Sequence, residues 1–140
     1  MSEPTLVDHV IHGRVPITPG RRSDVFNPAT GEVRARLSLG GTLEIDIAVA
    51  AARGAFPGWA ATPPHVRARV LFRFRDLVER DLDRLAALIT SEHGKVLSDA
   101  KGELIRGLEV VEFACGIPDL LKGEFSDQVG RGIDTFSLRQ

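Results

Sequence analysis

The sequence predicts a mixed α/β fold in which short β-hairpins precede about four α-helices. Three observations support this prediction. Before residue 40, apolar and polar residues alternate with a period of two, which is typical of a strand with one apolar face. Between residues 42 and 125, apolar residues recur every three or four positions, which is typical of amphipathic helices. Glycine and proline mark most boundaries between these segments, because both residues interrupt regular structure.

The predicted β-hairpins occupy residues 5–39. A short hairpin is expected within residues 5–15, with its turn at the histidine-glycine pair 12–13. A second turn is expected at residues 27–31, because the asparagine before proline is held extended and the final glycine tolerates positive φ. A strand with one apolar face follows at residues 33–39. Its apolar members are Val33, Ala35, Leu37 and Leu39.

The predicted helices occupy residues 42–125. The first takes Thr42 as its N-cap and ends at the proline-glycine pair 57–58. The second begins at residues 62–64, where proline in the first turn loses no hydrogen bond. Each helix is expected to bury an apolar stripe. The stripes are Ile45, Ala48, Val49, Ala52 and Phe56 in the first helix, and Val66, Val70, Leu71, Phe74, Leu77 and Val78 in the second.

The third predicted helix begins at residue 81 and ends at Gly94, a glycine suited to the left-handed conformation after a helix. Its inward residues are Leu82, Leu85, Leu88 and Ile89. The fourth helix takes Ser98 as its cap and is expected to be mostly buried. Its inward residues are Leu104, Leu108, Val111, Phe113 and Cys115. Gly102 and Gly107 each cost roughly 1 kcal/mol relative to alanine, which predicts close packing against another element.

The segment after this helix is expected to be less regular. Gly116 and Pro118 kink or end the helix, and a loop is expected from residue 127. A strand is expected to begin at Thr135–Leu138. The chain ends inside that strand, which is a poor position for a domain boundary.

The composition excludes several classes of protein. The 140 residues fit one domain, and the formal net charge of −1 lacks the basic excess of a nucleic-acid binder. No apolar run approaches the ~20 residues of a membrane helix. The acidic N-terminus resembles neither a secretory signal nor a transit peptide. The single cysteine excludes an internal disulfide and fits a reducing compartment, so a cytoplasmic protein without membrane or nucleic-acid partners is expected.

Few residues are candidates for chemistry. Cys115 lies in the middle of a helix on its apolar face, where thiols are usually structural. His93 has no second histidine or cysteine at ligand spacing, so no metal site is predicted. The arginines of the second helix are expected to pair with nearby carboxylates on a solvated face. No G-x-G-x-x-G follows a strand, so no dinucleotide-binding turn is predicted.

Arg106 is the candidate binding residue. It lies between the apolar residues Leu104 and Leu108, and its guanidinium offers two parallel hydrogen bonds to a carboxylate. The alternative is an ion pair within the helix. Glu103 and Glu109 each lie three positions away, which is a spacing at which helical side chains meet.

Several segments carry a resemblance to a known family. These are FNPATGEV at 26–33, WAATPPHVRARVLFRFRDLVE at 59–79, the run from Ile89 to Phe125, and the final SLRQ. The most specific part is GELIRGLEVVEFACGIP at 102–118. The chain resembles the N-terminal quarter of the CoA-acylating methylmalonate-semialdehyde dehydrogenases, which belong to the aldehyde dehydrogenase superfamily. The resemblance covers nearly the whole chain from His9 onward.

The resemblance implies that residues 1–140 are the N-terminal part of the NAD-binding domain of such an enzyme. Residues 5–39 would be its hairpins, 42–125 its helices, and 135–140 the start of an oligomerisation ribbon. The implied reaction converts methylmalonate or malonate semialdehyde to propionyl-CoA or acetyl-CoA in valine, pyrimidine or inositol catabolism. A cysteine nucleophile attacks the aldehyde, NAD accepts the hydride and CoA takes the acyl group.

The resemblance further implies that Arg106 holds the free carboxylate of the substrate. The family's nucleophile and its cofactor motifs lie beyond residue 140. We therefore expect this chain to bind neither NAD nor CoA alone and to be inactive, with a C-terminal part or a homo-oligomer as its partner. We also expect marginal stability and an exposed apolar patch. Two alternatives are a non-catalytic helical binding or regulatory module, and an active enzyme of which this sequence is one part.

Overall fold

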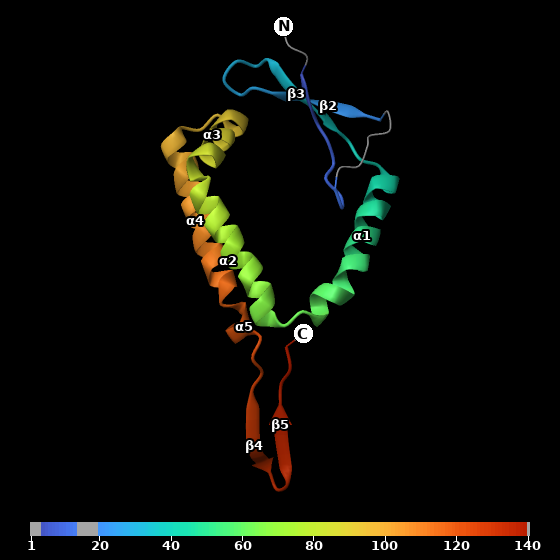
Figure 1. The fold of residues 1–140 in the computed structure, drawn as a ribbon, viewed down its shortest axis with the longest axis vertical. Coiled ribbons are helices and arrows are strands. Elements are labelled where there is room, and N and C mark those ends of the chain that lie inside the picture. The colour runs from blue at the N-terminus through green and yellow to red at the C-terminus, as the bar shows by residue number, and fades with distance from the viewer. Residues whose placement is uncertain (1–3, 14–19, 140) are drawn as a thin grey trace. The chain divides into compact units, whose positions relative to one another are not determined.

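The computed structural model describes residues 4–13 and 20–139. The chain forms two compact units, which are described separately. The first contains Met1–Ala61 and Asp83–Lys101, and the second contains Thr62–Leu82 and Gly102–Gln140. Small sheets and longer helices make up both units, which confirms the predicted α/β class (Figure 1).

The first unit begins with a three-stranded sheet. Strands β1 (Thr5–Val7), β2 (Arg22–Phe26) and β3 (Val33–Ser38) lie in the order β1-β3-β2. β2 and β3 are antiparallel, and their register shifts after Val25. β1 is parallel to β3, so the hairpin predicted within residues 5–15 is wrong for β1. β3 has a free edge after pairing with β2, and a third strand there makes a marginal two-stranded sheet more stable. Val15 lies outside the described residues.

The turn between β2 and β3 forms as predicted. Gly31 has a φ of 73°, and the side-chain oxygen of Asn27 accepts a hydrogen bond of 2.9 Å from the backbone N–H of Ala29. The backbone N–H of Asn27 donates to the carbonyl of Glu32 over 2.8 Å. Local side-chain chemistry therefore shapes this turn, which is why the sequence predicted it correctly.

Helix α1 (Thr42–Ala61) differs from its prediction at both ends. The backbone N–H of Gly41, just before the helix, donates a hydrogen bond of 2.7 Å to the Glu44 carboxylate. Thr42, the predicted N-cap, is already part of the helix. Pro57 lies inside the helix instead of ending it. One proline removes one backbone hydrogen bond, and the remaining bonds of the last turns persist around it.

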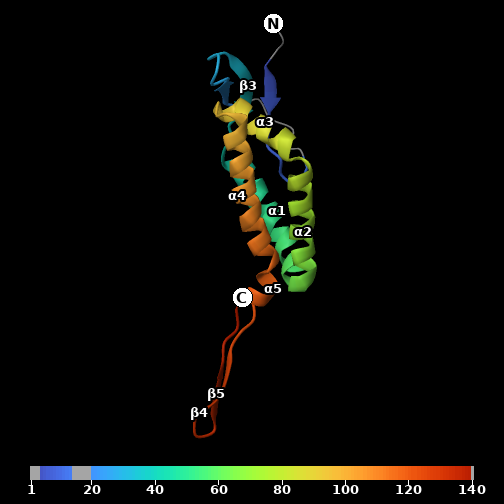
Figure 2. The same ribbon diagram turned by 90° about the vertical axis from the view of Figure 1, so that its left-hand side faces the viewer.

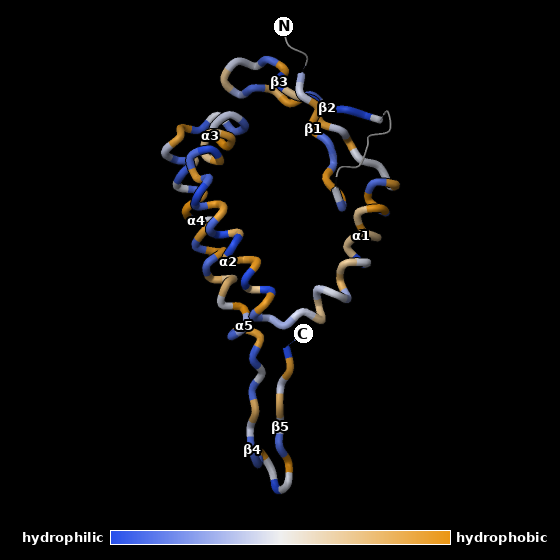
Figure 3. Tube along the Cα trace, in the orientation of Figure 1, coloured by the Kyte–Doolittle hydropathy of each residue, from blue (hydrophilic) through white to orange (hydrophobic). Residues whose placement is uncertain are grey.

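Much of α1 consists of apolar residues (Figure 3). None of its residues is buried. Ile45 and Phe56, which were expected to face inward, expose 62% and 67% of their surface. A helix that is apolar on all sides is normally enclosed by protein. The described part of the first unit does not enclose it.

Helix α3 (Leu82–His93), from Asp83 onward, completes the first unit together with the first turn of α4 (Leu97–Cys115). Gly94 ends α3 with a φ of 86°, and its N–H donates to the carbonyl of Thr90 over 2.8 Å, as predicted. α4 begins one residue before Ser98, and the carbonyl of Val96 accepts the first helical hydrogen bonds, so Ser98 is not the cap.

The second unit contains α2 (Pro64–Arg80), the rest of α4, and α5 (Ile117–Leu120). α2 starts with proline in its first turn, as predicted. α2 and the second-unit part of α4 lie side by side in both ribbon views (Figure 2). Their buried residues are small: Ala68 exposes 3% and Cys115 exposes 6%. The helix ends at Cys115 before Gly116, which confirms the predicted break.

The second unit ends in a ribbon of two strands, β4 (Phe125–Gly130) and β5 (Ile133–Phe136). The loop predicted before Thr135 is therefore wrong, since a strand already begins at Phe125. The predicted helices also end earlier, at Leu120. The residues of β4 lack a clear alternation of apolar and polar side chains, so the pairing with β5 could not be read from β4 alone.

Burial is the largest difference from the prediction. The buried apolar residues are Ala35, Ala68, Ala86, Ala100 and Cys115. In the predicted α2 stripe, Val66, Val70, Phe74 and Leu77 expose between 37% and 54% of their surface. Phe113 on α4 exposes 70% and Leu88 on α3 exposes 45%. Periodicity predicts which face of a helix is apolar, but another element must cover that face before it is buried.

Candidate functional site

Arg106 lies on α4 and is exposed, so the prediction of a mostly buried helix is wrong at this position. The structure shows no ion pair or hydrogen bond between Arg106 and another side chain among the described residues. Glu103 has an interaction of its own, and Glu109 forms no ion pair with Arg106. The ion pair within the helix is therefore not formed. The guanidinium remains available to a ligand.

Helical geometry places Arg106 away from α2. Leu108 and Val111 are half-buried on the same side of α4 as the buried Cys115. Arg106 precedes Leu108 by two positions, which is about 200° around the helix. The face around Arg106 instead carries Val110, which exposes 68% of its surface. Arg106 thus lies on an uncovered face that carries Glu103 and Glu109 as well as Val110.

The glycines beside Arg106 lack the close packing that was predicted for them. No atom of the described chain would lie within 4 Å of a Cβ at Gly102 or at Gly107. Neither glycine has a positive φ. The prediction is wrong for the described residues, because nothing in them covers this face of α4.

Arg75 connects α2 to α4. Its Nε lies 2.9 Å from the Glu112 carboxylate on α4, and its Nη1 lies 3.0 Å from Glu79 and 3.2 Å from Asp76 on α2. The hydrogen bonds to Glu112 and then Asp76 raise the pKa of Arg75 above its ordinary value. This cluster confirms the predicted pairing of an α2 arginine with carboxylates. It also fixes the rotation of α4, since Glu112 must face α2.

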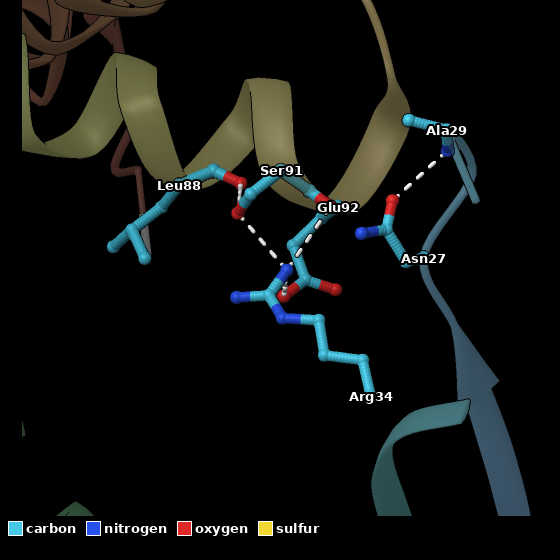
Figure 4. A network of polar contacts seen from close by, with 6 residues as sticks. All are labelled: Asn27, Ala29, Arg34, Leu88, Ser91 and Glu92. Carbon is cyan, nitrogen blue, oxygen red and sulfur yellow. Dashed lines mark hydrogen bonds and ion pairs between the residues drawn. The ribbon is translucent and has the colours of Figure 1, made fainter. Parts of the chain in front are cut away.

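A second polar network, within the first unit, was not predicted from the sequence (Figure 4). Nη1 of Arg34 on β3 donates to the carbonyl and the hydroxyl of Ser91, each over 3.0 Å, and lies 2.9 Å from the Glu92 carboxylate. The Ser91 hydroxyl donates to the carbonyl of Leu88 over 2.8 Å. The network attaches β3 to the last turns of α3.

The turn after β2 meets the same end of α3. A Cβ at Gly94 would lie 3.1 Å from Pro28, so the proline ring occupies the space beside this glycine. The only sequence signals were Asn-Pro in the turn and glycine after the helix. They predicted two local conformations, but they did not show that the two would be in contact.

The other candidates give no catalytic site. Cys115 is buried, as predicted for a structural thiol. Among the described residues, no three histidine, cysteine, aspartate or glutamate side chains are grouped to hold a metal ion. Within the same residues, no helix has both the length and the apolar character needed to span a membrane.

Comparison with known proteins assigns the chain to a family. Residues 17–140 match the model of the aldehyde dehydrogenase family. The malonate-semialdehyde dehydrogenase of Pseudomonas aeruginosa is 50% identical over 129 residues, which are 92% of this chain and 26% of that protein. Malonate-semialdehyde dehydrogenase 2 of Geobacillus thermodenitrificans is 44% identical over 140 residues, or 99% of this chain and 29% of that protein.

The chain is also similar to solved structures, including the following two. One, from Sinorhizobium meliloti 1021, is described as a methylmalonate-semialdehyde dehydrogenase complexed with NAD. It has a TM-score of 0.92 and 46% identity, and the match covers 100% of this chain and 29% of that one. The structure of methylmalonate-semialdehyde dehydrogenase from Oceanimonas doudoroffii has a TM-score of 0.90 and 51% identity. The match covers 96% of this chain and 28% of that one.

The fold and these matches place the chain in the mixed α/β class. Within that class, the chain belongs to the aldehyde dehydrogenase family. It spans between 19% and 29% of the length of the curated relatives named for malonate or methylmalonate semialdehyde.

Proposed function

We propose that the chain forms the N-terminal part of an NAD-dependent, CoA-acylating dehydrogenase of methylmalonate or malonate semialdehyde, and that it is inactive alone. In this proposal the enzyme is cytoplasmic and acts in valine, pyrimidine or inositol catabolism. Arg106 binds the carboxylate of the substrate. Support comes from the relatives, several of which are named for these two semialdehydes.

The observation that carries the role of Arg106 is that no described side chain forms an ion pair with it. Arg75 and Arg80 on α2 pair with neighbouring carboxylates. Arg106 has two glutamates three positions away and forms an ion pair with neither. A substrate that carries both an aldehyde and a carboxylate needs a cation for its carboxylate end. The planar guanidinium supplies two parallel donors for that group.

The exposure of Arg106 also supports inactivity of the chain alone. Ion pairs between exposed groups contribute only ~0–1 kcal/mol, because water competes for both partners. A bidentate pair is stronger when protein covers it and excludes water. Arg106 therefore needs a covering element before it holds a carboxylate with useful affinity, and the apolar side chain of Val110 is suited to contact with such an element.

We assign no NAD or CoA contact to the described residues. A nicotinamide dinucleotide binds where a helix connects two parallel strands. β1 and β3 are parallel, but the described chain between them contains β2 and no helix. In the proposed reaction NAD accepts the hydride and CoA accepts the acyl group. The role of this chain in that reaction is to position the carboxylate of the substrate.

We also propose that the ribbon of β4 and β5 takes part in oligomerisation, as was expected for a ribbon beginning at residues 135–140. Its strands expose Phe125, Val129, Ile133 and Phe136, each by more than half of its surface. The outer edges of a two-stranded ribbon have unpaired backbone groups, which a further strand can pair.

The test uses a chimaeric enzyme in which residues 17–140 replace the corresponding segment of the Pseudomonas aeruginosa relative. NADH formation is measured with malonate semialdehyde and with propanal, which lacks the carboxylate. We expect Arg106→Leu to raise KM for malonate semialdehyde by roughly ten- to a hundredfold, since a hydrogen bond to a charged group contributes about 1.5–3 kcal/mol. KM for propanal is expected to change little.

The matched control is Arg73→Leu, which removes an exposed arginine from α2. It should leave both KM values near those of the parent chimaera. Equal increases for the two aldehydes in Arg106→Leu would exclude a carboxylate role for Arg106.

A second candidate is a non-catalytic module that joins the oligomer of the intact enzyme. The uncovered apolar faces of α1 and of the ribbon favour it, because large exposed apolar surfaces are typical of interaction sites. The purified chain separates the two candidates. Co-migration with the intact relative on a sizing column, without NADH formation, would support the module. NADH formation by the chain alone would contradict its proposed inactivity.

A further inference from the structure

The base of the β4–β5 ribbon is bonded to the chain that leaves α5. The backbone N–H of Ser137 donates to the Glu124 carbonyl over 2.9 Å, and the backbone N–H of Glu124 donates to the Ser137 hydroxyl over 2.9 Å. Further along the chain, Nη1 of Arg139 donates to the Leu120 carbonyl over 2.9 Å. A Cβ at Gly123 would overlap the Ser137 carbonyl oxygen, so the two segments are also in close backbone contact. Ser137 and Arg139, with these bonds, are called the latch below.

The latch fixes the direction of the ribbon relative to α5. Among the described residues, β4 and β5 pair only with each other, and a ribbon of two strands is marginally stable by itself. Leu120 is the last residue of α5, and the final carbonyls of a helix have no partner within the helix. Arg139 supplies a donor to one of these carbonyls. The hydrogen bond therefore ties the returning end of the ribbon to the end of the helix.

The latch residues alternate with apolar residues that are exposed. Phe125 and Phe136 lie directly opposite each other in the ribbon, so their side chains share one face. They expose 68% and 72% of their surface, and Leu138, which lies between the two latch residues in the chain, exposes 76%. The side chains of Ser137 and Arg139 are bonded to the segment 120–124, whereas those of Phe136 and Leu138 are left in solvent.

We propose that Arg139 is a positioning residue for oligomerisation, because its bond to the Leu120 carbonyl holds the ribbon in the direction in which Phe125, Phe136 and Leu138 meet a second subunit. This inference rests on the proposed oligomerisation of the ribbon. The partner is a second copy of the intact enzyme, since these side chains continue the apolar ribbon surface for which that contact is proposed. Aromatic residues are enriched in such interfaces.

The physical reason is preorganisation. A ribbon without the latch keeps its own strand pairing but adopts several directions relative to α5. Association must then restrict these directions, and this ordering reduces the affinity between subunits. A latched ribbon has lost that freedom before the partner arrives.

The test uses the chimaeric enzyme and measures the dissociation constant of its oligomer by sedimentation over a concentration series. Arg139→Leu should raise this constant about tenfold, which corresponds to about 1.4 kcal/mol. Arg139→Lys should restore most of the affinity, because the bond to Leu120 uses one nitrogen and an ammonium group also donates to a carbonyl. Ser137→Ala removes the acceptor of the Glu124 N–H and should also weaken association, so it carries the test if Arg139→Leu does not fold.

Arg131→Leu is the matched control, because Arg131 is an exposed arginine in the turn between β4 and β5, at the other end of the ribbon. Its dissociation constant should equal that of the parent chimaera. Hydrogen exchange separates a local role from a general loss of stability. In Arg139→Leu the Ser137 N–H should exchange about tenfold faster. The Asp81 N–H, which donates to the Leu77 carbonyl at the end of α2, should exchange at the parent rate.

Phe136→Glu distinguishes a failure of this inference from a failure of the ribbon's proposed role. If Phe136→Glu dissociates the oligomer and neither latch variant changes the dissociation constant, the role of Arg139 is overturned and the role of the ribbon stands. If Phe136→Glu leaves the dissociation constant unchanged, the ribbon is not in the interface and both proposals fail. Equally faster exchange of the Asp81 and Ser137 N–H groups in Arg139→Leu would also overturn the inference, because it would show general unfolding.

Discussion

The contact between Arg34 and the end of α3 supports a quantitative prediction. Nη1 of Arg34 faces three acceptors, which are the carbonyl and hydroxyl of Ser91 and the carboxylate of Glu92. One guanidinium nitrogen carries two hydrogens, so it makes at most two full hydrogen bonds at a time. At about 0.5–1.5 kcal/mol each, the contact contributes about 1–3 kcal/mol. The lower half of this range applies, because the Arg34 side chain is 36% exposed and Glu92 is 56% exposed.

The perturbation is Arg34→Leu, and the control is Arg36→Leu on the same strand. Arg36 forms an ion pair with Asp24 at 3.3 Å, with both side chains about half exposed, and its loss should cost less than about 1 kcal/mol. Loss of about 1.4 kcal/mol from local stability increases the population of the locally open state about tenfold.

Hydrogen exchange measures this opening. The Gly94 N–H, which donates to the Thr90 carbonyl at the end of α3, is the reporter. In the chimaeric enzyme, its exchange should be about tenfold faster in Arg34→Leu, whereas Arg36→Leu should leave it within about threefold of the parent. Equal exchange rates in the parent and Arg34→Leu would refute the claim that Arg34 holds this end of α3.

Two further predictions concern backbone sites. The N–H of Gly41 lowers the pKa of Glu44 from 4.5, so the stability that Glu44 confers on the start of α1 is present at neutral pH and lost as pH falls below 4.5 through its folded pKa. Helicity measured by circular dichroism between pH 7 and pH 3 should fall less in Glu44→Gln than in the parent, and identical curves would contradict this. A Cβ at Gly123 would overlap the Ser137 carbonyl oxygen, so Gly123→Ala should speed exchange of the Ser137 N–H, which bonds the Glu124 carbonyl. Gly130→Ala should leave the exchange of the Ser137 N–H unchanged, because a Cβ at Gly130 meets only side-chain atoms of Ile133. Equal exchange rates of this N–H in the two variants would exclude a close approach of the chain at the ribbon base.

Features that depend on a few neighbouring residues were predictable from the sequence. The asparagine-proline turn, the proline start of α2, the left-handed Gly94 and the break after Cys115 all formed as expected. The expected helix around Arg106 formed, but the structure exposes Arg106 instead of burying it. Its lack of a partner could not be predicted, because Glu103 and Glu109 are both at pairing distance along the helix.

Features that depend on contacts between distant residues were decided only by the tertiary structure. β1 pairs in parallel with β3, Arg34 meets Ser91 at a separation of 57 residues, and Pro28 fills the space beside Gly94. Periodicity shows which side chains share a face, whereas burial depends on what reaches that face. The sequence alone therefore determined the turns, the main helices and the apolar character of their faces. The structure decided that most of those faces are uncovered by the described residues, since coverage requires atoms that lie far away along the chain.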